Sequence, residues 1–129
     1  MKKIEVVAAI VLADNKVFCA KRANKGEIAL KWEFPGGKIE SGETNEDALI
    51  REIKEELNSE IEIKEYFMTI EHQYSTFHLT MHSYLCELLS GNLELSEHVD
   101  SCWSSKDDLD HLDWADADIP IVTKLKDTL

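Results

Sequence analysis

Apolar and polar positions along the chain predict a sheet-rich fold with one long helix before its middle. Four runs show the near-continuous or alternating apolar pattern that is typical of strands. The four runs are residues 3–13, 16–22, 61–72 and 77–89. Asp14-Asn15 separates the first two runs and favours a hairpin turn. We expect the last two runs to pair with each other in antiparallel orientation.

The segment 45–57 carries the signals of an amphipathic helix at both of its ends. Thr44 is placed to cap the first turn, and Asp47 is a weaker capping-box partner three residues on. Asn58 suits the left-handed position just past the last turn. We therefore predict a helix over residues 45–57.

Less regular structure is predicted between and after these elements. Residues 23–30 lack periodicity and lead into WEFPGG at 32–37, where Pro35 and two glycines predict a functional loop. We expect a short strand at 100–103, a turn of helix at 105–109 and a final helix opened by Asp118 and Pro120. Because no linker, repeat or low-complexity tract interrupts the 129 residues, we predict one domain, 1–129.

The charge balance narrows the range of partners. The chain has 14 basic and 26 acidic residues, a formal net charge of −12. Such a chain repels a nucleic-acid backbone, because clustered Lys and Arg are needed to displace the counterions of that backbone. We therefore expect no nucleic-acid polymer as a partner.

Neither membrane insertion nor secretion is indicated. The longest apolar run, residues 6–13, is too short to cross a bilayer, and Asp14 ends it where a signal peptide needs small residues. The three cysteines are widely spaced and include no C-x-x-C pair, which argues against a disulfide framework and a thiolate zinc site. We predict an unprocessed, cytoplasmic protein without a membrane partner.

Three glutamates of the predicted helix share one face. At about 100° per residue, Glu52, Glu55 and Glu56 fall within roughly 100° of one another, beside the apolar stripe. These carboxylates repel each other unless a divalent cation lies between them. Mg²⁺ or Mn²⁺ suits such oxygen ligands and leaves positions for water and phosphate oxygens, so an anionic substrate would fit. The ordinary alternative is a solvated acidic face on which Arg51 pairs with Glu55.

The segment around this helix resembles the Nudix box, in which a glycine, five residues, a glutamate and seven residues precede R-E-aliphatic-x-E-E. The pattern occurs here as Gly37, Glu43, Arg51, Glu52, Ile53, Glu55 and Glu56. The final glycine and aliphatic residue of the box are replaced by Asn58 and Ser59. Asparagine tolerates the left-handed conformation, and we expect Ile61 to compensate for the apolar anchor that Ser59 lacks. IEVVAAI, WEFPGGK and ADIPIV extend the likeness to the MutT-like and CTP-pyrophosphohydrolase-like branch of the family.

The resemblance implies a fold and a set of metal ligands. The expected fold is an α/β/α sandwich with a mixed central sheet, in which the box is a loop–helix–loop catalytic segment. The implied ligands of Mg²⁺ or Mn²⁺ are the Gly37 carbonyl, Glu52, Glu55, Glu56 and Glu97. Glu43 and Arg51 would form an orienting ion pair. Glu97 stands six residues before Trp103, where such enzymes carry a metal-linked or base-like glutamate, although by itself it could be an exposed loop acid.

The implied reaction is the hydrolysis of a nucleoside triphosphate to a monophosphate and pyrophosphate. It requires an in-line water, neutralisation of charge on the phosphoryl oxygens and a base that accepts a proton. Glu52 is our first choice as base or water-orienting group, and Glu97 is the second.

Substrate contacts are implied at Arg22, near the phosphates or the base, and at Phe34, beside the glycines. The alternative for Arg22 is a plain surface charge. Aromatic residues of a small domain are more often core, which is the alternative for Phe34 and our interpretation of the three tryptophans. His78 and His82 lie too far apart on a strand, about 13 Å, to share a metal ion.

Asp118 bears on the identity of the base. It stands where MutT-type enzymes carry an asparagine that reads 8-oxoguanine, and an ionised aspartate only accepts hydrogen bonds. We therefore expect a base with an exocyclic amine, such as cytosine, unless burial keeps Asp118 protonated and able to donate. Phe77, where MutT carries an arginine, also argues against oxidised guanine. Asp118 could instead cap the last helix, and both roles could coexist.

Two classes of function remain open from the sequence. The first is a metal-dependent pyrophosphohydrolase for CTP, dCTP or a modified nucleotide such as 8-oxo-dGTP, acting in nucleotide-pool sanitation as a monomer or homodimer. The second is a Nudix-fold nucleotide-binding regulatory module without turnover, or a hydrolase of another nucleoside diphosphate derivative. The intact Glu52, Glu55 and Glu56 favour the enzyme.

Overall fold

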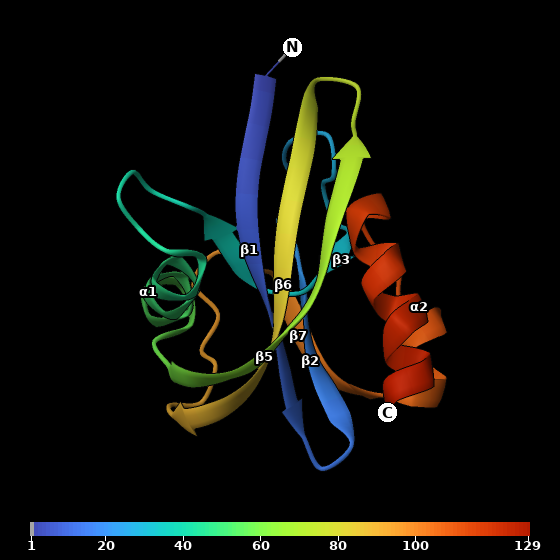
Figure 1. Cartoon of the computed structure of the whole chain (residues 1–129). Helices are drawn as coiled ribbons and strands as arrows, with labels where there is room; N and C mark the ends of the chain where they lie inside the picture. Colours follow the sequence, from blue (N-terminus) through green and yellow to red (C-terminus); the bar gives the residue numbers. More distant parts are fainter. Residues whose placement is uncertain (1) are drawn as a thin grey trace.

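The computed structural model describes residues 2–129 as a mixed β-sheet with helices on both faces (Figure 1). In chain order the elements are β1 (Lys2–Ala13), β2 (Lys16–Lys21), β3 (Trp32–Glu33), β4 (Gly36–Lys38), α1 (Asn45–Leu57), β5 (Glu60–Gln73), β6 (Phe77–Ser90), β7 (Asp100–Ser105), the 3₁₀ helices η1 (Lys106–His111) and η2 (Asp116–Asp118), and α2 (Ile119–Thr128). In Figure 1, α1 lies on one side of the sheet and α2 on the other. The predicted α/β/α sandwich is therefore confirmed.

The sheet has the strand order β3-β2-β1-β6-β5, with β4 added to β1 and β7 added to β2. β1 and β6 run parallel, and the other strand pairs run antiparallel. The predicted antiparallel pairing of β5 with β6 is confirmed, with three register shifts along it. Asp14 and Asn15 form the predicted hairpin turn with φ angles of 53° and 62°, the positive values that this tight turn requires.

Alternate residues of β1 enter two different cores, because successive side chains of a strand point to opposite faces. Val7 and Val11 pack with Leu49 and Ile53 of α1, whereas Ile10 belongs to a second cluster on the α2 face. All five side chains are almost fully buried, and burying each one stabilises the fold by about 1.5–3 kcal/mol. The long apolar run of β1 is therefore required by a sheet that is covered on both faces.

Helix α1 has the predicted bounds and caps. The Thr44 hydroxyl accepts a hydrogen bond from the Asp47 N–H (3.1 Å), and Asn58 adopts the left-handed conformation with φ 47°. Ser59 is buried through hydrogen bonds, since its hydroxyl donates to the Leu57 carbonyl (2.9 Å) and accepts from the Leu93 N–H (2.8 Å). The serine thus replaces an apolar anchor with a local polar one.

The WEFPGG segment differs from the predicted loop, because it contributes the two short strands β3 and β4. β4 pairs with β1, and a Cβ at Gly36 would collide with the carbonyl of Val7. Glycine permits this close approach, so the backbone pairs where local sequence indicated irregular structure. The strand predicted at 100–103 extends to Ser105, and the helical turn after it is η1. No helix within residues 2–129 has both the length and the apolar character needed to cross a bilayer.

Candidate active site

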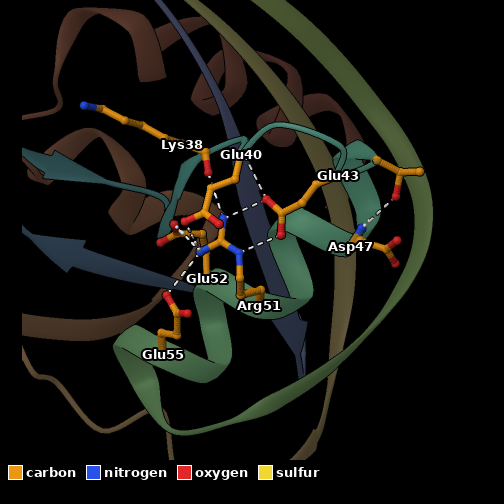
Figure 2. Close-up of polar contacts among 8 residues, drawn as sticks. Lys38, Glu40, Glu43, Asp47, Arg51, Glu52 and Glu55 are labelled. Carbon is orange, nitrogen blue, oxygen red and sulfur yellow. Dashed lines mark hydrogen bonds and ion pairs between the residues drawn. The ribbon is translucent and has the colours of Figure 1, made fainter.

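The Nudix-like segment folds around the guanidinium of Arg51 (Figure 2). Arg51 Nε and Nη2 donate to the two carboxylate oxygens of Glu43 at 2.6 and 2.9 Å, a two-pronged ion pair. Nη2 also donates to the carbonyl of Lys38 (3.0 Å), which joins the helix to the end of β4. Nη1 donates to Glu52 (2.9 Å) and Glu55 (3.1 Å). The hydrogen bonds from Arg51 hold the pKa of Glu43 below its ordinary value.

Gly37 and Glu52 lie in direct contact. Gly37 pairs with Val7 in the sheet, and a Cβ at Gly37 would overlap the carboxylate of Glu52. Glycine at this position therefore lets the helix place that carboxylate against the strand. The Glu52 side chain is largely buried, with 13% of its surface exposed.

Four carboxylates of the cavity lining, Glu33, Glu52, Glu56 and Glu97, interact beside this contact. Burial, and next the negative charge of Glu52 and a hydrogen bond with it, raise the pKa of Glu56 to about 8, and the charges of Glu33 and Glu97 contribute to the same rise. The Ser96 hydroxyl donates to the carbonyl of Glu56 (2.7 Å) and so holds the segment that carries Glu97 against α1. The negative charges of this cluster thus come from α1, from β3 and from the segment before β7.

The carboxylates are not arranged as a closed metal site. Among residues 2–129, no three His, Cys, Asp or Glu side chains are close enough to hold one ion. Glu52 and Glu55 both turn toward Arg51, and the Glu55 side chain is 61% exposed. The donor set nevertheless fits a hard divalent cation, because the mutual repulsion that raises the pKa of Glu56 is the charge that such a cation neutralises.

A cavity of about 510 Å³ opens beside the carboxylates. Its charged lining includes Arg22, Glu33, Glu52, Glu56, Glu97 and Asp118. Its apolar lining includes Ile4, Val6, Ile28, Phe34, Phe77, Leu79 and Met81. The cavity has the size and the mixed charged and apolar lining of a small-molecule site.

Asp118 is buried deep in this lining and does not cap α2. Its Oδ2 accepts a hydrogen bond from the Phe34 backbone N–H (3.0 Å), and it makes no side-chain hydrogen bond to the helix that follows. Burial, and next the negative charge of Glu33, raise the pKa of Asp118 well above its ordinary value. The raised pKa favours the neutral acid, which donates as well as accepts and which the sequence left open as the alternative to an ionised aspartate; the form of Asp118 that reads a base stays a prediction.

Phe34 belongs to the core as well as to the cavity wall. Its ring is 2% exposed and stacks on Trp114, with 4.7 Å between the ring centroids and 23° between the planes. Trp114 is itself buried and donates through Nε1 to the Leu109 carbonyl (2.7 Å). The core alternative for Phe34 is thus supported, and contact between Phe34 and a base stays a prediction.

Sequence reasoning missed a partly buried network at Glu33. Arg22 Nη1 donates to Glu33 Oε1 (2.9 Å), and His98 Nε2 lies 2.9 Å from Glu33 Oε2. Arg22 directly follows β2, Glu33 lies in β3 and His98 lies in the segment before β7, and all three line the cavity. Arg22 is therefore no plain surface charge. Glu33 and His98 could have been found from the sequence, because they directly neighbour the predicted site residues Phe34 and Glu97.

His78, His82 and Trp103 lie outside the cavity lining. His78 and His82 contact acidic partners on the sheet, Glu71 and Glu5 respectively. Trp103 packs edge-on against Phe18 with 5.5 Å between the centroids but is 39% exposed, so its interpretation as a core residue is wrong. Trp32 is half-buried and packs against the core.

Comparison with known proteins identifies the family. Residues 6–124 match the model of the NUDIX domain. The chain is 37% identical over 122 residues to the CTP pyrophosphohydrolase of Escherichia coli K12, covering 95% of this chain and 90% of that protein. It is 35% identical over 127 residues to the 8-oxo-dGTP diphosphatase of the same organism, covering 98% of each.

A solved structure of a Nudix hydrolase is also similar to this chain. The solution structure of the DNA mismatch repair protein MutT, a Nudix hydrolase from methicillin-resistant Staphylococcus aureus 252, is 44% identical and covers 100% of each chain with a TM-score of 0.81. The family match spans the box, the whole of α1 and the first part of α2. The chain therefore belongs to the Nudix hydrolase family.

Proposed function

We propose that the chain is a divalent-metal-dependent pyrophosphohydrolase that converts a nucleoside triphosphate to its monophosphate and pyrophosphate. The observation that carries this proposal is the meeting of Glu52, Glu56 and Glu97 in the lining of a cavity that also has an apolar lining. A triphosphate needs charge neutralisation where it is cleaved, and a base needs an apolar wall. The relatives named above carry the corresponding activities in their names.

The carboxylates would serve metal binding and proton transfer, and the two roles overlap at Glu52 and Glu97. Glu52, Glu55, Glu56, Glu97 and the Gly37 carbonyl would hold Mg²⁺ or Mn²⁺. That ion supplies Lewis-acid neutralisation of the phosphoryl oxygens when bound. Glu52 accepts the proton of the attacking water, and Glu97 is the second candidate for this step. Arg51 orients Glu52 through its 2.9 Å hydrogen bond, and Glu43 in turn fixes Arg51.

The base pocket accepts more than one base. A neutral Asp118 donates and accepts, so it complements the amine and ring nitrogen of cytosine as well as the carbonyl and N–H edge of 8-oxoguanine. Arg22 and Phe34 lie beside it in the same lining. We therefore propose CTP, dCTP and 8-oxo-dGTP as the substrate group, hydrolysed in the cytoplasmic nucleotide pool. The three cysteines, all free thiols, are compatible with that reducing compartment.

The proposal is tested by pyrophosphate release from a nucleotide panel, with Mg²⁺ and then with chelator. Turnover that needs the metal supports the enzyme, whereas tight nucleotide binding without turnover supports the regulatory module. Asp118→Asn tests the neutral acid, because an amide also donates and accepts. We expect this variant to keep its relative kcat/KM for CTP and 8-oxo-dGTP within about threefold of wild type. A tenfold loss for CTP alone would show that an ionised carboxylate reads the base.

A further inference from the structure

A single carboxylate ties two segments that are far apart in the sequence. Glu27 lies in the β2–β3 loop, residues 22–31, and accepts four hydrogen bonds from the turn between β5 and β6. Its Oε2 accepts from the N–H (2.7 Å) and the hydroxyl (2.6 Å) of Ser75. Its Oε1 accepts from the N–H (3.1 Å) and the hydroxyl (2.8 Å) of Thr76. Both carboxylate oxygens are thus engaged by one turn.

The two tied segments are both walls of the cavity. The loop contributes Ala23, Lys25 and Ile28 to the lining, and the residues that flank the turn, Tyr74 and Phe77, contribute to it as well. The turn itself is closed by a hydrogen bond from the Tyr74 N–H to the Phe77 carbonyl (2.9 Å). Glu27 is absent from the lining, so any effect that it has on a bound molecule passes through these walls.

Glu27 supplies the hydrogen bonds between the loop and the β5–β6 turn, while Lys31 Nζ at the end of the loop donates to both carboxylate oxygens of Asp113 (3.0 Å each). The backbone hydrogen bonds of the loop, such as Lys25 N–H to Ala23 carbonyl and Lys31 N–H to Ile28 carbonyl, run within the loop and fold it locally. The four bonds to Glu27 reach across 48 and 49 residues of sequence. Hydrogen bonds to an ionised carboxylate are stronger than neutral ones, which suits a contact that must persist on an exposed surface.

We propose that Glu27 is a positioning residue for nucleotide binding, which fixes the β2–β3 loop against the β5–β6 turn and so holds Ile28 and Phe77 in place as cavity walls. The inference rests on the proposed function, in that the cavity holds the nucleotide. Because Glu27 lies outside the carboxylate cluster of the box, it affects binding of the substrate rather than the chemical step.

The test is Glu27→Gln, which keeps the side-chain shape but turns an amide NH₂ toward hydrogen-bond donors. We expect KM for CTP and for 8-oxo-dGTP to rise about fivefold or more while kcat stays within about twofold. The Kd for CTP, measured by calorimetry, should rise in parallel, and the amides of residues 22–31 should exchange hydrogen faster. Glu65→Gln, at an exposed carboxylate on β5, is the matched control and should change none of these.

Unchanged KM and Kd in a folded Glu27→Gln variant would overturn the inference, and so would a fall in kcat alone. If that variant does not fold, Ser75→Ala and Thr76→Val, each removing one hydroxyl donor, must together raise KM or Kd, and unchanged values would overturn the inference. Failure of the proposed function is separate, because it appears as absent turnover in wild type, whereas Kd and hydrogen exchange still test Glu27.

Discussion

The Nudix-box residues of the cavity lining come from one continuous segment, Gly37 to Glu56, whereas Asp118 and the residues around it come from several distant segments. Glu52 and Glu56 stand one turn apart on α1, and Arg51 on the same helix orients the first of them. Asp118 meets Phe34 across 84 residues of sequence. A local motif therefore predicts where the chemical step occurs, whereas recognition of the base depends on how the sheet brings separate segments together.

The largest expected effect concerns the carboxylates of the box. Glu56→Gln should lower kcat about a thousandfold or more with the fold intact, because it removes charge that stabilises the transition state rather than core packing. Pyrophosphate release by the purified variant measures this effect, and circular dichroism checks the fold. Glu46→Gln, in the exposed first turn of the same helix, is the control and should retain wild-type turnover. Near-normal turnover of Glu56→Gln would remove Glu56 from the proposed metal ligands.

The next effect concerns Phe34, where the core and the cavity meet. Phe34→Ala should lower the free energy of unfolding by about 3 kcal/mol, since it leaves a void against Trp114. In the folded enzyme KM should rise more than kcat falls, as expected for a residue that contacts the base. Urea unfolding and steady-state kinetics measure the two parts. Lower stability with unchanged KM would show that Phe34 serves the core alone.

A smaller effect separates the charged and neutral forms of Asp118. Its folded pKa is raised, so folding favours the protonated acid, and stability falls as pH rises above the ordinary value of 3.8 toward the folded pKa. The Asp118→Asn variant has no proton to lose at this position. The difference in free energy of unfolding between the variant and wild type should therefore grow in favour of the variant as pH rises in that window, and it should be close to zero near pH 4. Urea unfolding of both proteins from pH 4 to 8 measures the difference. Parallel curves would show that the carboxylate is not forced to stay neutral.

The smallest effect concerns the exposed Glu27. Hydrogen bonds from Ser75, and then from Thr76, lower its pKa to about 2. A lowered pKa means that its contribution to stability is present above the ordinary value of 4.5 and is lost as pH falls through about 2. The stability difference between wild type and Glu27→Gln should therefore shrink from pH 5 to pH 2, measured by thermal unfolding. A constant difference would mean that the contact does not depend on charge.

The strength of local signals explains why the box was predictable. The bounds of α1, its cap at Thr44 and the left-handed Asn58 follow from interactions within a few residues. The Arg51–Glu43 ion pair also joins residues of one segment, and the predicted pair is confirmed. Such features form between neighbours in the chain, so their spacing in the sequence suffices to predict them.

Other features depended on the sheet. The short strands β3 and β4 exist because β2 and β1 pair with them, and WEFPGG alone predicted a loop. The contact of Glu33 with His98 and that of Glu27 with the β5–β6 turn join residues 65 and 48 or 49 positions apart, which no local pattern encodes.

Residue patterns in the sequence were sufficient to predict helix α1, the apolar alternation of the strands, the acidic face of α1 and the family. The tertiary structure raises the pKa of Asp118 through burial and through the charge of Glu33, 85 positions earlier in the chain, which no local pattern predicts. It likewise decided that Phe34 is a core residue stacked on Trp114. The physical reason is common to both, since desolvation and packing are properties of the surroundings in space, whereas capping and helical spacing are properties of the neighbouring chain.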